Sequence, residues 1–379
     1  MRDKKNILFV FGTRPEAIKL APVILEMKKY PALYNVTICN TEQQKELSNQ
    51  TLSFFGLKAD INLNVMTFNQ TLAALQSKIL KKLSEIFQKN KFDAVIVQGD
   101  TMSIFCGALA AFYNKVPVFH VEAGLRSYNM AEPFPEEAIR QMVSKITDLH
   151  FAPTQLSYRA LLDEKIPPDK IFITGNTVVD ALFYLPENVM LEAEGFWSRL
   201  SIRPSNDIVL ITAHRRENHG ARMEEILSSI KELADKFKKH KFVIPVHPNP
   251  NVKKKVLGAL SGKNNILITE PLDYPHLVWI MKNSKLILTD SGGIQEEAPA
   301  FGVPTLVMRY ETERKEGIEL GLAKLVGTDR AVIVRESEMY LAKDKLSVRT
   351  DSSKNPYGDG HAAEYILRSI REYFKGNII

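Results

Sequence analysis

A chain of 379 residues, 45% hydrophobic and 25% charged with a formal net charge of +6, has the length and composition of a folded protein with two domains of ordinary size. No apolar stretch approaches the roughly 20 residues needed to span a bilayer, and no Pro, Gly or Ser tract indicates disorder. A membrane protein and a disordered chain are therefore excluded, and a cleft between two domains is expected.

The charges and cysteines narrow the possible partners and the compartment. Lysine clusters are interspersed with acids and do not alternate with aromatic residues, so we expect no nucleic-acid partner. A bound anionic small molecule explains the modest positive charge better. Only Cys39 and Cys106 could pair, so nothing indicates a disulfide framework, and the apolar run after Lys5 is too short for a signal peptide. We expect a cytoplasmic protein without a membrane partner.

Short apolar runs of β type alternate with longer helical patterns along the whole chain, which is typical of parallel sheets built from βαβ units. In the first half, strands are predicted at Ile7–Phe11, Val36–Cys39, Ala94–Val97, Val116–Val121, Leu149–Ala152 and Ile171–Thr174. Amphipathic helices are predicted between them, as at Leu72–Phe87 and Glu137–Ile146.

A second series of strands follows at Ile208–Thr212, Phe242–Val246, Ile266–Thr269, Leu286–Thr289, Thr305–Met308 and Ala323–Val326. The segment Pro186–Asp207 has no strand character and is predicted to be a linker. We therefore expect an N-terminal domain at 1–178 and a C-terminal domain at 200–355. The last segment, 356–379, contains a helical pattern and is expected to pack back on the first domain.

In open α/β sheets, ligands bind beyond the carboxyl ends of the strands, and here the residues at those places are unusually polar. The first strand is followed by Gly12-Thr13-Arg14-Pro15-Glu16-Ala17-Ile18-Lys19. Arg14, Lys19 and a helix N-terminus could hold a phosphate there, or the segment could be only a capped helix with a solvated arginine. The turn lacks the Gly-x-Gly-x-x-Gly pattern, so dinucleotide binding has no support.

Three acids are expected at one edge of the first sheet. Asp100 follows the strand Ala94–Val97, Glu122 follows the next strand, and Glu136 opens a helix. Taken singly, Asp100 could be an N-cap, and Glu136 could serve the helix dipole or pair with Arg140 four residues on. Their convergence favours proton transfer, because adjacent carboxylates raise one another's pKa.

The second half carries the candidate anion site. The block Asp290-Ser291-Gly292-Gly293 joins a strand to a helix, and its two glycines let backbone N–H groups approach a diphosphate. Glu297 could accept from ribose hydroxyls, and Arg314 adds a cation. His214, after the strand Ile208–Thr212, is a candidate for phosphate contact or proton transfer, or a plain surface histidine.

Two further chemistries are disfavoured by the motifs. The eight histidines are scattered, and neither Cys-x-x-Cys nor His-Glu-x-x-His occurs, so no metal cofactor is expected. The Gly-x-Ser-x-Gly elbow of serine hydrolases is not found either.

Taken together, these blocks resemble the non-hydrolysing UDP-N-acetylglucosamine 2-epimerases over nearly the whole chain. The resemblance rests on Gly12–Lys19, Gly99–Thr101, Val121–Arg126, Pro135–Glu137, His214–Asn218, Asp290–Pro299 and Asn355–Gly360. It implies the GT-B fold, in which two Rossmann-like, doubly wound parallel-sheet domains face each other across a cleft. It also implies a homodimer, a UDP-sugar substrate and no cofactor.

The resemblance further implies roles for individual residues. The acids matching Asp100, Glu122 and Glu136 act in catalysis, and the histidine matching His214 supports the departing diphosphate. The nucleotide-sugar site is implied to be lined by Arg14, Lys19, Arg140, Ser291, Gly292, Gly293, Glu297 and Arg314. The implied reaction interconverts UDP-N-acetylglucosamine and UDP-N-acetylmannosamine through a glycal and free UDP, supplying N-acetylmannosamine for surface polysaccharide synthesis.

The chain departs from the family's pattern at two places. Many relatives have Gln-His-Arg at Gln43-Gln44-Lys45, where they bind an activating second UDP-N-acetylglucosamine, together with an arginine at the position of Asn69; weak activation is therefore expected here. At Tyr310–Lys315 relatives have Asp-Thr-Thr-Glu-Arg-Pro, which leaves a modified hexosamine open as substrate. The competing readings are a GT-B glycosyltransferase and a UDP-sugar sensor without activity.

Overall fold

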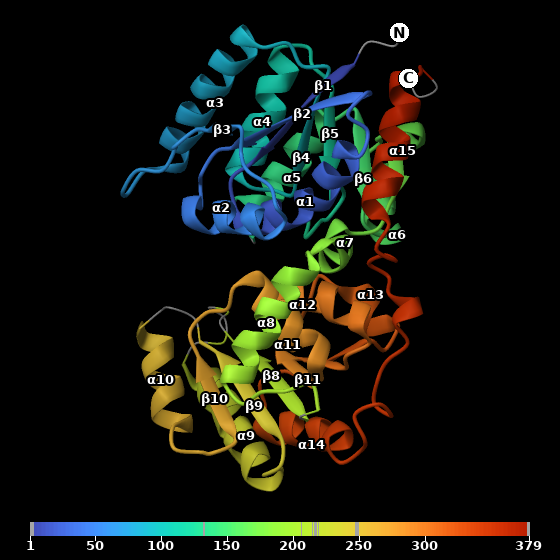
Figure 1. Cartoon of the computed structure of the whole chain (residues 1–379). Helices are drawn as coiled ribbons and strands as arrows, with labels where there is room; N and C mark the ends of the chain where they lie inside the picture. Colours follow the sequence, from blue (N-terminus) through green and yellow to red (C-terminus); the bar gives the residue numbers. More distant parts are fainter. Residues whose placement is uncertain are drawn as a thin grey trace. The chain divides into compact units, whose positions relative to one another are not determined.

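The computed structural model of the chain describes residues 4–131, 133–205, 207–213, 215, 218, 220–246 and 250–376. The chain divides into two compact units, unit 1 with Met1–Leu185 and Tyr357–Ile379 and unit 2 with Pro186–Pro356 (Figure 1). Each unit is built on one open sheet, and all the strand pairs in both sheets are parallel in the described residues. The predicted α/β class with two parallel sheets is confirmed.

Unit 1 has a seven-stranded sheet in the order β3-β2-β1-β4-β5-β6-β7. The strands are β1 (Lys5–Phe11), β2 (Tyr34–Asn40), β3 (Ile61–Asn62), β4 (Ala94–Gln98), β5 (Val118–Val121), β6 (Leu149–Ala152) and β7 (Ile171–Ile173). The helices are α1 (Arg14–Lys28), α2 (Lys45–Phe54), α3 (Leu72–Lys89), α4 (Met102–Tyr113), α5 (Glu136–Lys145), α6 (Gln155–Asp163), α7 (Thr177–Tyr184) and α15 (Ala362–Phe374).

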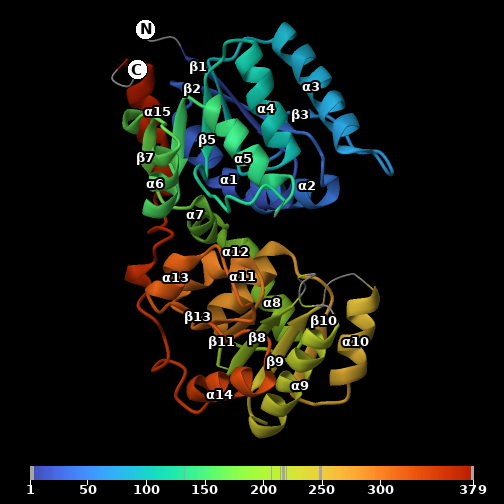
Figure 2. The same ribbon diagram turned by 180° about the vertical axis from the view of Figure 1, so that it is seen from behind.

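The helices of unit 1 cover both faces of its sheet. Helix α1 packs with α7 and α15 on one face, and α4 packs with α3 and α5 on the other (Figures 1 and 2). The central strands β1 and β4 are therefore buried on both faces, which explains their continuous apolar runs. The C-terminal helix α15 is anchored by rings, because Phe119 of β5 contacts Tyr373 and Phe374 edge-on at 5.1 and 6.1 Å between centroids.

Unit 2 has a six-stranded sheet in the order β10-β9-β8-β11-β12-β13. The strands are β8 (Ile208–Thr212), β9 (Lys241–Pro245), β10 (Ile266–Thr269), β11 (Ser284–Thr289), β12 (Thr305–Val307) and β13 (Ala323–Leu325). The helices are α8 (Glu187–Arg199), α9 (Ala221–Lys236), α10 (Pro250–Leu260), α11 (Tyr274–Asn283), α12 (Gly292–Glu297), α13 (Lys315–Glu319) and α14 (Arg330–Leu341).

Both sheets reverse their strand order at one point, between β1 and β4 in unit 1 and between β8 and β11 in unit 2. At such a point the connections leave in opposite directions and open a crevice at the carboxyl ends of the strands. The candidate residues Gly12–Lys19 and Asp100 follow β1 and β4, and Asp290–Gly293 follow β11. The topology thus places the predicted motifs where an open sheet binds ligands.

The linker predicted at Pro186–Asp207 is wrong, because Glu187–Arg199 form helix α8. Its Trp197 is fully buried, donates from Nε1 to the carbonyl oxygen of His276 at 3.0 Å, and stacks on Trp279 at 6.1 Å. The apolar face is narrow, since only Ala193 and Trp197 of this helix are buried. Ala193 and Trp197 lie four residues apart, and one such pair among many charged residues is too weak a periodic pattern to predict a helix.

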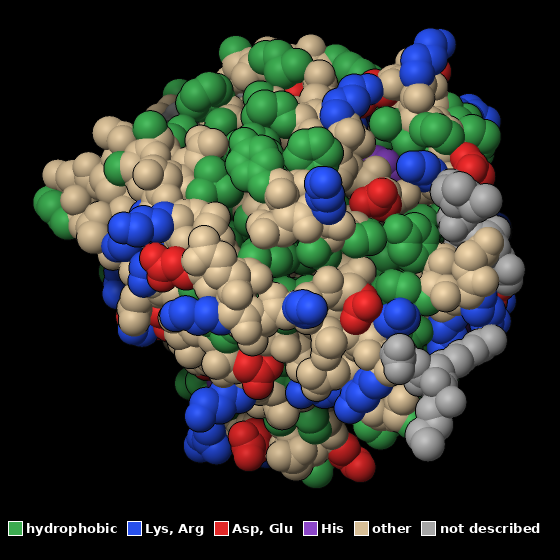
Figure 3. All heavy atoms as spheres, turned by 90° about the horizontal axis from the view of Figure 1, so that it is seen from above, with side chains coloured by type: hydrophobic (Ala, Val, Ile, Leu, Met, Phe, Trp, Pro, Cys, Tyr) green, Lys and Arg blue, Asp and Glu red, His purple; other side chains and the backbone are tan. Residues whose placement is uncertain are grey.

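Basic and acidic side chains are mixed on the surface of the described residues, as they are along the sequence. In Figure 3 the lysines and arginines are interspersed with acids on the face shown, rather than gathered into one basic area. Among the residues that the structure describes, no helix is long and apolar enough to cross a membrane.

Candidate active site

The switch point of unit 1 is held together by the buried carboxylate of Glu16. Its Oε2 accepts from the backbone N–H groups of Gly12 and Thr13 at 2.7 and 2.9 Å, and its Oε1 accepts from the Thr101 hydroxyl at 2.5 Å. One side chain therefore ties the turn after β1 to the turn after β4. Gly12 is required there, because a Cβ would lie 2.0 Å from the Thr41 hydroxyl oxygen.

The pKa of Glu16 is also strongly shifted. Burial raises the pKa of Glu16 from 4.5 to about 7, against the opposing effect of its three hydrogen bonds, and the charge of Asp100 raises it further. The sequence marked Glu16 only as part of the first turn. Its burial and its bond to Thr101 arise from tertiary contacts.

Glu122 lies at the carboxyl end of β5 in the left-handed region, with φ of 64°. Lys19 of α1 donates to Oε1 and Gln98 at the end of β4 donates to Oε2. Asn176, just before α7, donates to Oε1 at 3.0 Å. The side chains of Glu122 and Lys19 are only 6% and 12% exposed, so this is a buried ion pair. The partner that a buried carboxylate needs is therefore present.

Asp100 is paired with Arg140 of α5. The guanidinium donates from Nε at 2.8 Å and lies 2.7 Å from the same carboxylate oxygen through its second terminal nitrogen. The N-cap of α4 is Thr101, so the reading of Asp100 as an N-cap is wrong. Strand β4 pairs with β5, and the two acids Asp100 and Glu122 therefore follow neighbouring strands.

Glu136 is half-buried in the first turn of α5, one turn before Arg140. The ion pair on this helix joins Arg140 to Glu137 at 3.2 Å rather than to Glu136. Glu137 is fully buried and accepts from the backbone N–H groups of Ser127 and Tyr128 at 2.9 and 3.2 Å. Burial alone would raise the pKa of Glu137, but these hydrogen bonds hold that pKa below its ordinary value.

The turn after β1 is also clamped from the side of β2. The backbone N–H of Gln44 donates to the Gly12 carbonyl at 2.7 Å, and the Arg14 N–H donates to the Gln44 side-chain oxygen at 3.0 Å. Lys45 bonds Asn64 at 2.9 Å. Two of the residues that depart from the family's pattern thus have local partners in this chain.

A buried histidine supports the same edge. Nε2 of His120, in β5, lies 2.8 Å from the Gly99 carbonyl oxygen. Burial lowers the pKa of His120 to about 4, so the ring is neutral at physiological pH. Nothing in the sequence marks His120 as functional, because its position inside an apolar strand is typical of a core residue.

In unit 2 the turn after β11 is organised by Asp290, which is fully buried. One of its carboxylate oxygens accepts from the Arg215 backbone N–H at 2.9 Å and from the Asn218 side chain at 3.0 Å. The carboxylate therefore joins the segment after β8 to the turn after β11, across the switch point of this sheet.

The predicted anion turn lies next to the predicted cation. Ser291 is the N-cap of α12, and Gly292 is its first residue. A Cβ on Gly292 would lie 2.9 Å from Cζ of Arg314, so the guanidinium packs directly on this glycine. Arg314 is held by Glu296 at 2.8 Å and by Glu313 at 3.2 Å. The structure thus brings Ser291, Gly292, Gly293 and Arg314 together.

Two neighbours complete this region of unit 2. Glu297 is buried at the end of α12. Burial alone would raise the pKa of Glu313, but the charges of Arg314 and Arg309 lower this pKa to about 2. The predicted His214 lies outside the described residues.

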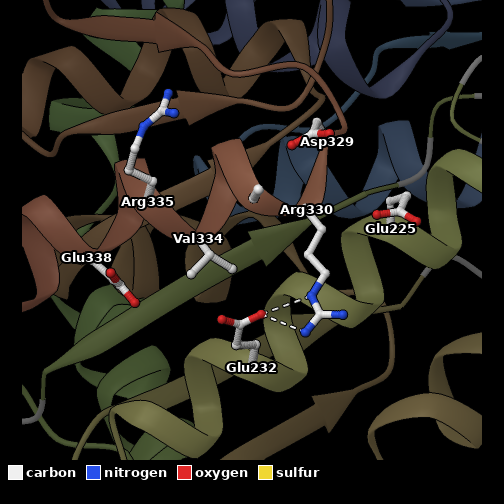
Figure 4. Close-up of a pocket in the computed structure, with 8 residues that line it drawn as sticks. Glu225, Glu232, Asp329, Arg330, Val334, Arg335 and Glu338 are labelled. Atoms are coloured by element: carbon white, nitrogen blue, oxygen red, sulfur yellow. Dashed lines mark hydrogen bonds and ion pairs between the residues drawn. The ribbon is translucent and has the colours of Figure 1, made fainter.

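A separate charged groove of unit 2 lies between α9 and α14 and has a volume of about 400 Å³. Figure 4 shows Arg330 pointing at Glu232, and its Nε and terminal nitrogen lie 2.9 and 2.7 Å from one carboxylate oxygen. The groove is lined mainly by side chains of these two helices rather than by the turns that follow the strands, and its Arg330 is paired with its Glu232. Among the described residues, no group of three or more His, Cys, Asp and Glu is placed to hold a metal ion.

Two parallel-sheet units, with acids at the strand ends of one and a glycine turn backed by arginine in the other, define an enzyme of the GT-B class. A glycosyltransferase of kitacinnamycin shares this fold alone, at 12% identity and a TM-score of 0.63 over 97% of this chain. The chain belongs to the UDP-N-acetylglucosamine 2-epimerase family, whose sequence pattern matches residues 26–371.

Individual relatives agree with this assignment. The UDP-N-acetylglucosamine 2-epimerase of Neisseria meningitidis is 44% identical over 96% of this chain and 99% of its own length, and that of Escherichia coli K12 is 42% identical over 97% and 98%. The crystal structure of the Neisseria meningitidis enzyme bound to UDP-GlcNAc has a TM-score of 0.85 at 43% identity, covering 97% of this chain and all of that one.

Proposed function

We propose that this protein interconverts UDP-N-acetylglucosamine and UDP-N-acetylmannosamine by eliminating and re-adding UDP. The observation that carries the proposal is the set of acids at the carboxyl ends of β4 and β5 and the start of α5. Two of them, Glu122 and Asp100, are held by the cations Lys19 and Arg140. Three acids on one sheet suit a reaction that removes a proton from one face of a sugar and returns one to the other.

The proposed reaction balances without oxidation or reduction. A carboxylate takes the proton from sugar carbon 2, the electrons of that C–H bond form the double bond to carbon 1, and the bond from carbon 1 to the diphosphate oxygen breaks. UDP leaves with the electron pair. A second acid then returns a proton to the opposite face of carbon 2 while UDP adds back to carbon 1.

The catalytic acids of the proposal are Asp100, Glu122 and Glu136. Lys19 holds the Glu122 carboxylate in place and Arg140 holds that of Asp100, each through an ion pair. His214 is proposed to support the expelled diphosphate.

Substrate-binding residues are proposed in each unit. Arg14 and Lys19 contribute cations from unit 1. In unit 2 the turn at Ser291, Gly292 and Gly293 offers backbone N–H groups to the diphosphate beside the Arg314 guanidinium. Glu297 is proposed to accept hydrogen bonds from the ribose.

We propose a homodimer in the cytoplasm that supplies N-acetylmannosamine for surface polysaccharide synthesis, with no nucleic-acid or membrane partner. Light scattering of the purified protein measures the oligomer directly, and a monomeric mass at working concentrations would contradict this part.

The decisive experiment follows the hydrogen on carbon 2. Purified protein is incubated with UDP-N-acetylglucosamine alone in deuterated water, and proton NMR records the sugar signals. Deuterium at carbon 2 together with the manno epimer is expected. An unchanged spectrum after prolonged incubation would rule the function out, and transfer to an added acceptor without epimer would indicate a glycosyltransferase.

A second candidate, epimerisation of a modified UDP-hexosamine, is favoured by Tyr310. Tyr310 is 60% exposed, and the Arg222 guanidinium lies 5.2 Å from the centroid of its ring. The ring packs on Gly327, because a Cβ at that position would lie 2.7 Å from a ring carbon. An aromatic ring offers a different surface from the aspartate of many relatives. Faster turnover of a UDP-diacetamido sugar than of UDP-N-acetylglucosamine would favour this candidate.

A further inference from the structure

The carboxylate of Glu122 is held from three elements. An ammonium such as that of Lys19 is a compact charge on a flexible stem and can pair with a carboxylate in many orientations. The planar amides of Gln98 and Asn176 fix the orientation more narrowly, because each donates to a different oxygen of Glu122. The three donors come from α1, the end of β4 and the start of α7.

The amide of Asn176 is oriented by its role as a helix cap. Asn176 is the N-cap of α7, and its side-chain oxygen accepts from the Val178 backbone N–H at 3.0 Å. With the oxygen committed to the cap, the amide nitrogen points to Glu122 at 3.0 Å. The residue is 3% exposed, so a helix end and not solvent sets the direction of this donor.

The position of Asn176 depends in turn on the segment where the chain re-enters unit 1. Its backbone N–H donates to the Tyr357 carbonyl oxygen at 2.6 Å. This approach needs two glycines, because a Cβ on Gly358 would lie 3.2 Å from Cα of Gly175, and Gly358 has a φ of +121°. Asp180 of α7 fastens the same segment by accepting from the N–H groups of Ala362 and Ala363 at 3.2 and 2.7 Å.

We propose that Asn176 is a positioning residue for Glu122, and that the re-entry segment at Tyr357 and Gly358 sets its place. The inference rests on the proposed epimerase function, in which Glu122 exchanges the proton on sugar carbon 2. Asn176 does not touch the substrate in this scheme. It acts through the orientation of the carboxylate, so its loss changes turnover and leaves nucleotide binding intact.

Two substitutions of Asn176 separate orientation from helix capping. Asn176→Ser keeps a capping oxygen but is too short to reach Glu122, and Asn176→Asp keeps shape and cap but replaces the donor with a second negative charge. We expect kcat to fall by about 10²-fold for the serine variant, the effect of a misplacement of about 1 Å, and by more for the aspartate variant. KM and the Kd for UDP should stay within about twofold of the wild-type values.

A matched control and a remote variant complete the experiment. Thr154→Ala removes the cap of α6, where the threonine accepts from the Ser157 N–H at 3.3 Å, so it should lower Tm and leave kcat unchanged. Gly358 is not among the donors to Glu122, yet Gly358→Ala should lower kcat with KM unchanged, since it displaces the Tyr357 carbonyl that accepts from the Asn176 N–H.

The outcomes separate the two proposals. Wild-type kcat in both Asn176 variants, with an active wild-type enzyme, would overturn the positioning role alone. A matched loss of kcat and Tm in Thr154→Ala and Asn176→Ser would reduce Asn176 to a cap and overturn it as well. If the wild-type protein puts no deuterium on carbon 2, the epimerase function fails first and the inference fails with it.

Discussion

The ion pair between Lys19 and Glu122 gives a sharp test of how the site is held. Lys19→Met keeps the length of the side chain but leaves the Glu122 carboxylate, only 6% exposed, without its cation. Removing one partner of a buried ion pair usually costs about 3–5 kcal/mol. Two further donors, Gln98 and Asn176, still reach the carboxylate, so we expect about 3 kcal/mol, the lower end of that range.

The double variant Lys19→Met/Glu122→Gln removes both charges and should recover most of this loss. The neutral amide can still pair with its neighbours, and replacing a buried ion pair by neutral groups is often close to neutral in free energy. A coupling energy of about 2 kcal/mol is therefore expected from the double-mutant cycle. For a unit of this size, the single variant should lower Tm by roughly 6–12 °C.

The assay is calorimetric or urea unfolding of the four proteins of the cycle. Lys375→Met is the matched control, because its ammonium also pairs with a glutamate of the same unit, Glu372, but the two side chains are 42% and 36% exposed. Such exposed pairs contribute at most about 1 kcal/mol. If Lys19→Met is no more destabilising than the control, or if the double variant loses as much as the two single variants together, the buried pair is refuted.

Four further outcomes are expected. Burial raises the pKa of Glu16 from 4.5 to about 7, so the free energy of unfolding of the wild type relative to Glu16→Gln is unchanged below pH 4.5. This free energy should fall by about 3 kcal/mol as the pH rises from 4.5 to 7. Urea unfolding of both proteins at pH 5 and 8 measures the difference, and a difference that does not depend on pH contradicts the prediction. Gly292→Ala would displace the guanidinium that lies 2.9 Å from its new Cβ, so calorimetry should record UDP binding weakened about tenfold or more, and unchanged affinity would remove this turn from the diphosphate site. Adding a little UDP-N-acetylglucosamine to a reaction started from UDP-N-acetylmannosamine should not switch it on, whereas strong activation would show that other residues form an effector site. Amide replacements of the three acids should each lower turnover by roughly 10²–10⁴-fold while UDP still binds; the variants are Asp100→Asn, Glu122→Gln and Glu136→Gln. Wild-type turnover in any one variant would exclude that residue from the chemistry.

The sequence was sufficient for most of the sheets. All twelve predicted strands are found within two residues at each end, because each is a short apolar run between helical patterns. Strand β3 was missed, since Ile61–Asn62 are only two residues and carry no periodic signal. Helix α8 was missed for the related reason that its buried face has only two apolar residues.

For the candidate site, the sequence alone determined which residues stand at the strand ends, because the carboxyl ends of parallel strands lie at one edge of a sheet. Only the tertiary structure decided their partners. Lys19 and Glu122 are separated by 103 positions and Asp100 and Arg140 by 40, so no local pattern joins them. Asn176 is the clearest case: no motif in the sequence marks it, and only the tertiary structure brings its amide nitrogen within 3.0 Å of the Glu122 carboxylate.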